Sequence, residues 1–157
     1  MKNILLVSDE DLCRSRMAKA LLADFGRGMH LFTAGVVAGT TISQLVDEVM
    51  EEHGQEISHS APMALSSVDL AQMDFVVTLT AEAQEAVTAL GVQPVKMASL
   101  QIADPFRGHG SVEQKREALE QTYEELHRAL FRLYRNVLSD MLMPTCTCGA
   151  NTYCRCE

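Results

Sequence analysis

A short apolar run next to the N-terminus constrains the fold of this chain most strongly. Residues 4–7 are Ile, Leu, Leu and Val, and a polar loop follows them directly. Beyond the loop, apolar side chains recur at helical spacing, at Met17, Ala20, Leu21 and Phe25. A second apolar run at residues 30–33 comes after the glycines at 26 and 28, which end the helix. Strand, loop, helix and strand in this order predict a parallel βαβ unit.

The rest of the chain continues the same alternation. We expect further strands at residues 75–79 and 94–97, and helices over 42–50, 66–72 and 80–90. Thr41 with Gln44, and Ser111 with Gln114, have the spacing of capping boxes, the second at the start of a long helix reaching about residue 141. The pattern predicts an α/β three-layer sandwich with a four-stranded parallel sheet. Ligands of such folds bind beyond the carboxyl ends of the strands, where the loop after residue 7 lies.

Composition narrows the class of protein. The chain has 157 residues, 21 acidic against 13 basic, and a formal net charge of -8. We therefore expect no nucleic acid and no membrane as partner, since both are anionic. No apolar stretch is long enough for a membrane span or shaped like a secretory signal, so the expected location is cytoplasmic. We predict one domain over residues 1–143, followed by a cysteine-rich tail over residues 144–157.

The loop carries a resemblance to a known family. Residues 8–15 read Ser, Asp, Glu, Asp, Leu, Cys, Arg and Ser, and low-molecular-weight protein tyrosine phosphatases have Cys, Thr, Gly, Asn, any residue, Cys, Arg and Ser in this frame. Other segments also resemble that family: 33–35 (Thr-Ala-Gly), 73–77 (Met-Asp-Phe-Val-Val) and 104–106 (Asp-Pro-Phe). The resemblance spans about residues 1 to 140. It implies the phosphotyrosine phosphatase I-like fold, which the family shares with thioredoxin-linked arsenate reductases.

The resemblance also implies catalytic roles for three residues. Ser8 stands where the family has its nucleophilic cysteine, Arg14 where it has the arginine that binds phosphate, and Asp104 where it has the general acid. A hydroxyl ionises several pH units above a thiol and needs a neighbouring base, and no histidine lies near Ser8 in the sequence. We therefore expect turnover to be lost or severely reduced.

Three acidic residues of the loop bear on phosphate binding. Asp9, Glu10 and Asp11 stand in an anion-binding loop, and carboxylates about 6 Å from a bound anion repel it by about 1 to 3 kcal/mol each. We expect phosphate to bind poorly. Glu10 replaces a family glycine, so a positive φ at that position would distort the loop.

Three arrangements of these acids stay open. A loop carboxylate can fold back and pair with Arg14, which closes the site on itself. Asp9, Glu10, Asp11 and Asp104 can instead gather a divalent cation. The simplest arrangement is a solvated acidic loop, which we prefer to a cation site.

The remaining members of the anion loop are Leu12, Cys13 and Ser15. Cys13 sits at a helix N-terminus beside Arg14, which would lower its pKa and make it an alternative nucleophile. We favour burial of Cys13 as a small apolar residue. Without a thiolate to steady, Ser15 is better explained as a helix cap.

Four of the five cysteines lie in the tail. Cys146, Cys148, Cys154 and Cys156 form two C-x-C pairs that suit tetrahedral Zn²⁺, and a redox-active or disordered tail is the competing interpretation. The core domain needs no cofactor. An arsenate reductase would need a downstream cysteine pair, and residues 14–145 contain no cysteine.

The sequence thus supports three function hypotheses. The first is a phosphatase-like binding or regulatory module, a pseudoenzyme whose partner is a phosphoprotein or a small anion. The second is a weak or unusual phosphatase that uses Ser8 or Cys13 with Arg14 and Asp104. The third is a metal- or redox-responsive protein acting through its tail. The oligomeric state stays open.

Overall fold

A four-stranded parallel sheet forms the centre of the molecule, as predicted. The structure is a computed structural model that describes residues 1–90, 96–108 and 110–142. β1 (Lys2–Ser8) lies between β2 (Met29–Gly35) and β3 (Phe75–Thr78), and the sheet order is β2-β1-β3-β4. β4 (Met97–Ser99) pairs with β3. All three strand pairs are parallel, so the carboxyl ends of the strands share one edge.

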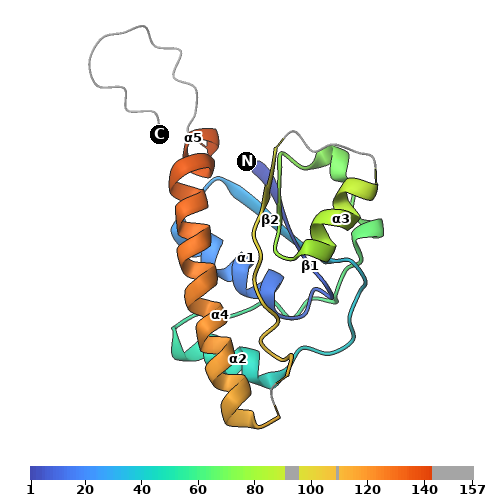
Figure 1. Ribbon diagram of the computed structural model, residues 1–157. Coiled ribbons are helices and arrows are strands. Elements are labelled where there is room, and N and C mark those ends of the chain that lie inside the picture. The colour runs from blue at the N-terminus through green and yellow to red at the C-terminus, as the bar shows by residue number, and fades with distance from the viewer. Residues whose placement is uncertain (91–95, 109, 143–157) are drawn as a thin grey trace, which may run out of the picture.

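Helices cover both faces of the sheet, which makes three layers (Figure 1). Alternate residues of β1 enter opposite faces: Ile4 and Leu6 belong to one apolar core, Leu5 and Val7 to the other. The first core is closed by α1 (Arg14–Phe25), α2 (Gln44–Glu52) and α4 (Val112–Leu133). The second is closed by α3 (Ala81–Ala89) and two short 3-10 turns, Leu65–Ser67 and Leu70–Gln72. β1 is therefore apolar throughout its centre because it is buried on both sides.

The long C-terminal helix is nearly continuous. α4 passes into a π-helical turn, Tyr134–Leu138, and then into α5 (Ser139–Leu142). Tyr134 stands against Gly26 at the end of α1, where a side chain of any other residue would collide with the Tyr134 hydroxyl. The glycine that ends α1 thus also makes room for the turn of the neighbouring helix.

Two of the predicted helix starts are confirmed. Ser111 and Gln114 form the capping box of α4, each side chain bonding the other's backbone N–H. Thr80 caps α3 and accepts from the N–H of Ala83 at 3.0 Å.

Among the boundaries that differ from the sequence predictions, three are notable. Ser43 rather than Thr41 caps α2, because the Ser43 hydroxyl accepts from the N–H of Leu45. The helix predicted over residues 66–72 is split into the two 3-10 turns. β4 begins at Met97, later than the predicted strand at 94–97, of which residues 94 and 95 lie outside the described part of the chain.

A helix that spans a membrane must be both long and apolar. Across residues 1–90, 96–108 and 110–142, none of the helices combines enough length with enough apolar character to cross a membrane.

Replacing Leu126 by alanine should destabilise the fold strongly. Leu126 in α4 is fully buried in the core between α4 and the sheet. Leu126→Ala should lower the free energy of unfolding by about 2 to 5 kcal/mol in urea titrations followed by circular dichroism. The neighbouring exposed Glu125→Ala should change it by less than about 0.5 kcal/mol. Equal losses in both variants would contradict this assignment of the α4 core face.

Candidate anion site at the carboxyl end of the first strand

The loop between β1 and α1 is held open by neighbours that bind its carbonyl groups. The carbonyl oxygens of Ser8, Asp9 and Glu10 accept from the N–H groups of residues 36, 37 and 39 at 3.0, 3.1 and 2.9 Å. The carbonyl oxygen of Asp11 accepts from Nε of Arg16 at 2.7 Å. Four successive carbonyl groups are thus bound outside the loop. We call residues 8–15 the cup loop.

Two glycines allow the segment after β2 to lie this close to the cup loop. A Cβ at Gly35 would come 2.6 Å from the backbone carbon of Glu10, and a Cβ at Gly39 would come 2.5 Å from a methyl group of Leu12. Larger residues would force the two segments apart. The Thr-Ala-Gly motif at residues 33–35 therefore serves the loop as well as the strand.

The N–H groups of the cup loop are left available. In the described part of the chain, no hydrogen bond uses the N–H of Leu12, Cys13, Arg14 or Ser15 as donor. The last two belong to the first turn of α1, whose N–H groups have no partner within the helix. Successive free N–H groups at a helix N-terminus attract anions.

Asp11 has the one positive φ found among the non-glycine residues described, 58°. Its carboxylate is fully buried and accepts from the Ser15 hydroxyl at 2.8 Å and the Met63 N–H at 3.0 Å. Arg16, which is 1% exposed, places its guanidinium 3.4 Å from the same carboxylate. Aspartate tolerates this backbone conformation, and its charge is neutralised by a buried arginine.

This arrangement corrects two sequence predictions. The left-handed position of the cup loop is Asp11 and not Glu10, so the glutamate imposes no strain. Ser15 does not cap α1, because its hydroxyl donates to Asp11 and the N-cap position is held by Cys13 without a side-chain bond. The third loop carboxylate, that of Asp11, is fully buried and paired with Arg16.

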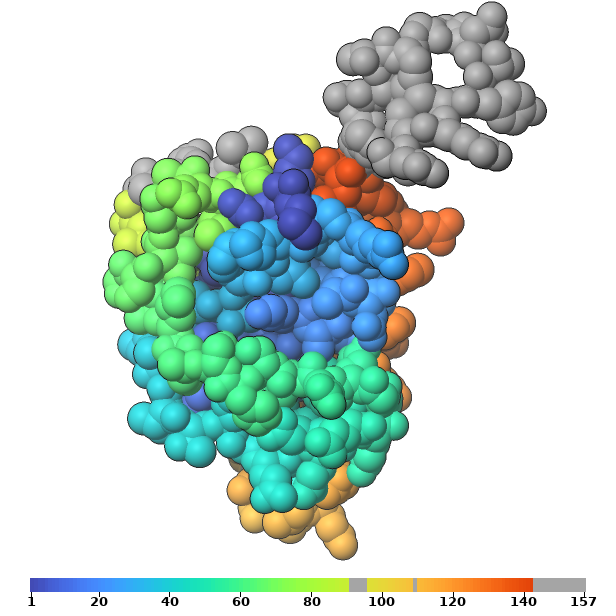
Figure 2. Space-filling view, turned by 180° about the vertical axis from the view of Figure 1, so that it is seen from behind, coloured from blue at the N-terminus to red at the C-terminus, as the bar shows by residue number. Residues whose placement is uncertain are grey.

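Arg16 also connects the cup loop to a distant part of the chain. Its guanidinium donates to the carbonyl oxygen of Ser58 at 2.7 Å. Figure 2 shows the segment that follows α2, in green, lying against the blue N-terminal third on this face of the molecule. The loop is thereby fixed to the segment that returns from α2 to the sheet.

Arg14 is paired with a loop carboxylate. This pairing is one of the three arrangements of the loop acids that the sequence left open. One guanidinium nitrogen lies 3.1 Å from the Asp9 carboxylate, and the other donates to the carbonyl oxygen of Ile102 at 2.7 Å. The second oxygen of Asp9 accepts from the Thr80 hydroxyl at 2.7 Å. Arg14 is 8% exposed, and two of its five N–H donors are used in these bonds.

Ser8 lines a recess of about 520 Å³ that opens beside the cup loop. Arg14 and Asp104 line the same recess, so all three residues predicted as catalytic meet there. The other lining residues are Asp9, Glu10, Leu12, Cys13, Thr41, Ser43, Leu45, Phe106 and Lys115. We call this the main recess.

The Ser8 hydroxyl has no base beside it. It is 2% exposed and accepts the N–H of Asp11 at 3.3 Å, and no histidine or carboxylate bonds to it within the described residues. The Asp104 carboxylate accepts the N–H of Phe106 at 2.9 Å and so forms the turn at Pro105. Asp104 keeps a place in the recess and also fixes the shape of its own loop.

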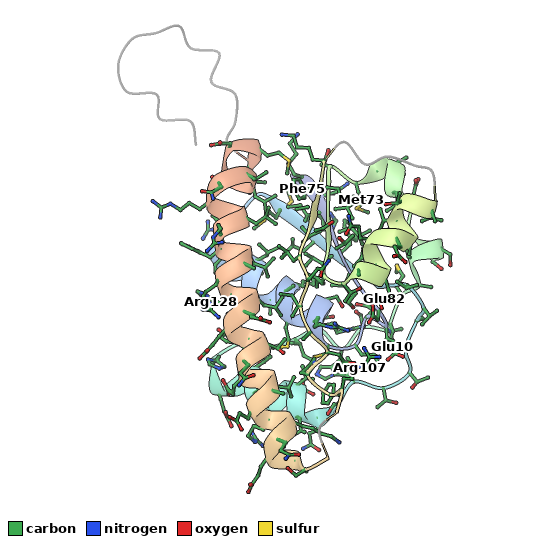
Figure 3. The ribbon with its side chains drawn as sticks, in the orientation of Figure 1. Glu10, Met73, Phe75, Glu82, Arg107 and Arg128 are labelled. Carbon is green, nitrogen blue, oxygen red and sulfur yellow. The ribbon has the colours of Figure 1, made fainter. Side chains whose placement is uncertain are left out.

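A second recess of about 570 Å³ meets the first at the Asp9–Arg14 pair. It is lined by residues of the loop after β4 and by the start of α3, among them Glu82 and Arg107. Figure 3 shows Glu10, Glu82 and Arg107 gathered at this end of the sheet. Charges of both signs therefore border the cup loop.

Cys13 is a poor candidate for a nucleophile. Burial raises the pKa of its thiol to about 12, against the lowering effect of Arg14 and together with a further raising effect of Asp104. Its Sγ lies 3.8 Å from the sulfur of Met17, as expected of a packed apolar side chain. The sequence alternative of an activated Cys13 thiolate is not supported.

The acids of the cup loop do not form a cation site. Within residues 1–90, 96–108 and 110–142, no three His, Cys, Asp or Glu side chains are placed to hold one metal ion. Asp11 points away from Asp9, and the two pair with different arginines. The predicted zinc ligands at 146, 148, 154 and 156, with the whole tail, lie outside the described residues.

Sequence reasoning missed three residues of this site. Arg16 and Thr80 support the two loop aspartates, and Lys115 brings a cation to the main recess from the first turns of α4. Arg16 had a signal in the sequence, because an arginine on the inner face of an otherwise apolar helix needs a buried anion. Thr80 and Lys115 are brought to the loop by tertiary structure alone.

A parallel sheet whose first strand ends in a cup of free N–H groups, with an arginine at the start of the next helix, defines the phosphotyrosine phosphatase I-like class. The family described as low molecular weight phosphotyrosine protein phosphatase matches residues 3–140. This chain belongs to that family.

Known proteins agree with this membership. The chain is 31% identical over 116 residues to "Probable low molecular weight protein-tyrosine-phosphatase EpsP" of Ralstonia nicotianae, a match covering 68% of this chain and 80% of that protein. The tyrosine phosphatase Wzb of Escherichia coli, solved with sulphate, matches with a TM-score of 0.71 at 22% identity, covering 85% of this chain and 96% of Wzb. A YwlE arginine phosphatase mutant with a phosphorylated active-site serine in place of cysteine matches with a TM-score of 0.68 at 21% identity, covering 90% and 99%.

The buried Asp11–Arg16 pair should be costly to break. Asp11→Asn leaves the Arg16 charge without its anion, and we expect a loss of about 3 kcal/mol in the free energy of unfolding. Glu10→Gln, an exposed neighbour, should change it by less than about 0.5 kcal/mol. Urea titration of both variants measures the free energy of unfolding. An unchanged free energy in Asp11→Asn would show that the pair does not hold the loop.

Cys13 should resist alkylation. Because its pKa rises from 9.0 to about 12, the thiol stays protonated well above neutral pH, and its thiolate fraction there falls about a thousandfold. Iodoacetamide labelling followed by peptide mass mapping should therefore modify the Cys13 peptide far more slowly than an unfolded control, with a rate that rises between pH 7 and 9. Labelling as fast as in the unfolded chain would contradict a raised pKa of the thiol.

Proposed function

We propose that this member of the family binds a phosphorylated group of a protein or a small molecule in the main recess without hydrolysing it repeatedly. The chain would then act as a binding or regulatory module rather than as an ordinary phosphatase. The observation that carries the proposal is the cup loop itself: its carbonyl groups are bound outward and its N–H groups are free, while Ser8 offers a hydroxyl without a base.

The charges of the loop favour this function more than the sequence suggested. Of the three carboxylates, Asp11 is neutralised by Arg16 and Asp9 is paired with Arg14. Glu10 is exposed, where water screens its charge. Arg14 keeps N–H donors for an anion, and Lys115 adds a cation to the same recess.

A relative of the same fold supports an oxyanion as ligand. Wzb is described in complex with sulphate, a tetrahedral anion of the size of phosphate. The cup loop of this chain has free N–H groups followed by an arginine, and both suit such an anion. Phosphate is therefore the probe of choice.

A second candidate is a slow phosphomonoester hydrolase. The YwlE mutant described with a phosphorylated active-site serine supports it, because a hydroxyl at that place of the fold can carry a phosphoryl group. In this chain the corresponding residue is Ser8, and Asp104 lines the same recess. Repeated release of product from an aryl phosphate would favour this candidate over the binding module.

Phosphate should stabilise the chain through Arg14. With phosphate well above its dissociation constant the melting temperature should rise, since a ligand that binds the folded state alone stabilises it by mass action. The rise should disappear in Arg14→Ala and persist in Arg128→Ala, which removes an equal charge from an exposed position of α4 that does not line the main recess. Equal shifts in both variants, or none in the native chain, would refute binding in the cup.

Removing the charge of Asp9 should tighten phosphate binding. An asparagine side chain can still form hydrogen bonds with Arg14 and Thr80. Asp9→Asn therefore mainly removes a negative charge near the anion. We expect the dissociation constant for phosphate to fall by about tenfold, from a repulsion of about 1 to 3 kcal/mol. Glu10→Gln, at an exposed position, should change it by less than about twofold. Weaker binding in Asp9→Asn, measured by calorimetry, would mean that the charge of Asp9 is needed to orient Arg14.

A further inference from the structure

We propose that Ser8 is a single-use phosphoryl acceptor. Its hydroxyl takes the phosphoryl group from an aryl phosphate monoester bound in the main recess and keeps it. The proposal rests on the proposed function, because the ester must first bind in the cup. It adds a covalent modification site that controls the same recess.

The position of Ser8 provides the first argument. Ser8 is the last residue of β1 and the first of the cup loop, and it lines the main recess together with Arg14. Its hydroxyl oxygen accepts a hydrogen bond from the N–H of Asp11, so the hydroxyl proton is not used in that bond. A phosphoryl group held by the free N–H groups and Arg14 would therefore have this oxygen as its protein neighbour.

Formation of the bond to phosphorus does not require a strongly basic nucleophile. In the loose transition state of monoester transfer, the bond to the attacking oxygen is weak and the bond to the leaving oxygen is largely broken. Positioning and charge stabilisation then matter more than the basicity of the attacking oxygen. The Ser8 hydroxyl can therefore accept the group once and slowly, although the missing side-chain base rules out rapid turnover.

The step balances without another reactant. The bond from Ser8 Oγ to phosphorus forms, and the ester P–O bond breaks with its electron pair going to the aryl oxygen. The proton of the hydroxyl passes to a phosphoryl oxygen and then to water. With a weakly basic aryl oxide, the leaving group needs no protonation by Asp104.

Bond breakage is where serine differs from cysteine. Hydrolysis of the phosphorylated chain would expel the serine oxygen, and in a loose transition state most of the charge collects on that leaving atom. An alkoxide is far more basic than an aryl oxide or a thiolate, so this second step is slow. Phosphorylated Ser8 should accumulate and occupy the cup with its own phosphate.

The consequence is a covalent switch on the binding module. Once Ser8 carries the phosphoryl group, the N–H groups of the cup and Arg14 have an internal anion to bind. External phosphate or a phosphorylated partner then loses its site. The chain would pass from a binding state to a filled state after one reaction.

The test uses the full chain with p-nitrophenyl phosphate. We expect a burst of nitrophenolate that ends at one equivalent per chain, and an increase in intact mass by one phosphoryl group located on the Ser8 peptide. The filled chain should no longer be stabilised by added phosphate. No burst, continuous release beyond one equivalent, or a phosphoryl group on another residue would overturn the proposal.

Three variants separate the steps. Ser8→Ala should lose the burst and the mass increase, whereas Ser66→Ala, an exposed serine, should keep both. Ser8→Cys should release nitrophenolate beyond one equivalent, because a thiolate leaves readily from phosphorus. A stable adduct that also stops Ser8→Cys at one equivalent would overturn the argument from the leaving group.

The outcomes distinguish this inference from the proposed function. If the native chain is stabilised by phosphate but shows no burst, the binding module stands and the acceptor role fails. If the native chain is not stabilised by phosphate, the proposed function itself fails.

Discussion

The shape of the candidate site depends on a buried ion pair. Asp11 occupies the left-handed backbone position of the cup loop, and the guanidinium of Arg16 bonds both its carboxylate and its carbonyl oxygen. Breaking such a pair costs several kcal/mol, because a single charge would remain in the core. The pair therefore fixes the backbone of the loop and, through Ser58, the segment that approaches it from α2. The free N–H groups follow from that fixed backbone.

The acidic character of the loop has a different meaning in three dimensions than in the sequence. Counted along the chain, three carboxylates seem to oppose one arginine. In the structure each buried or half-buried carboxylate has its own cation, Asp9 with Arg14 and Asp11 with Arg16. The two carboxylates differ in burial: Asp11 is fully buried, whereas Asp9 lines the main recess and would compete with an anion for Arg14.

Much of the fold could be predicted because it rests on local patterns. The uncharged centre of β1 predicts burial on both faces, and the Ser111–Gln114 spacing predicts the start of α4. The start of α2 was misplaced because Thr41 and Ser43 are both good caps, and the local pattern does not choose between them. The electrostatics of the site could not be predicted, since Arg16, Thr80 and the carbonyl oxygen of Ile102 reach the loop only through packing.

The partners of the loop aspartates also bear on whether the loop has simply decayed. An aspartate that arose by drift at a buried position would be left without a cation, and the fold would lose several kcal/mol. Asp11 instead has three different donors, and Asp9 has two. Such complete pairing keeps the free N–H groups facing the recess while the thiol is replaced by a hydroxyl. Under the proposed function, this chain would separate two properties of a phosphatase site: oxyanion binding, for which the N–H groups and Arg14 are available, and expulsion of the product, for which the Ser8 hydroxyl is poorly suited.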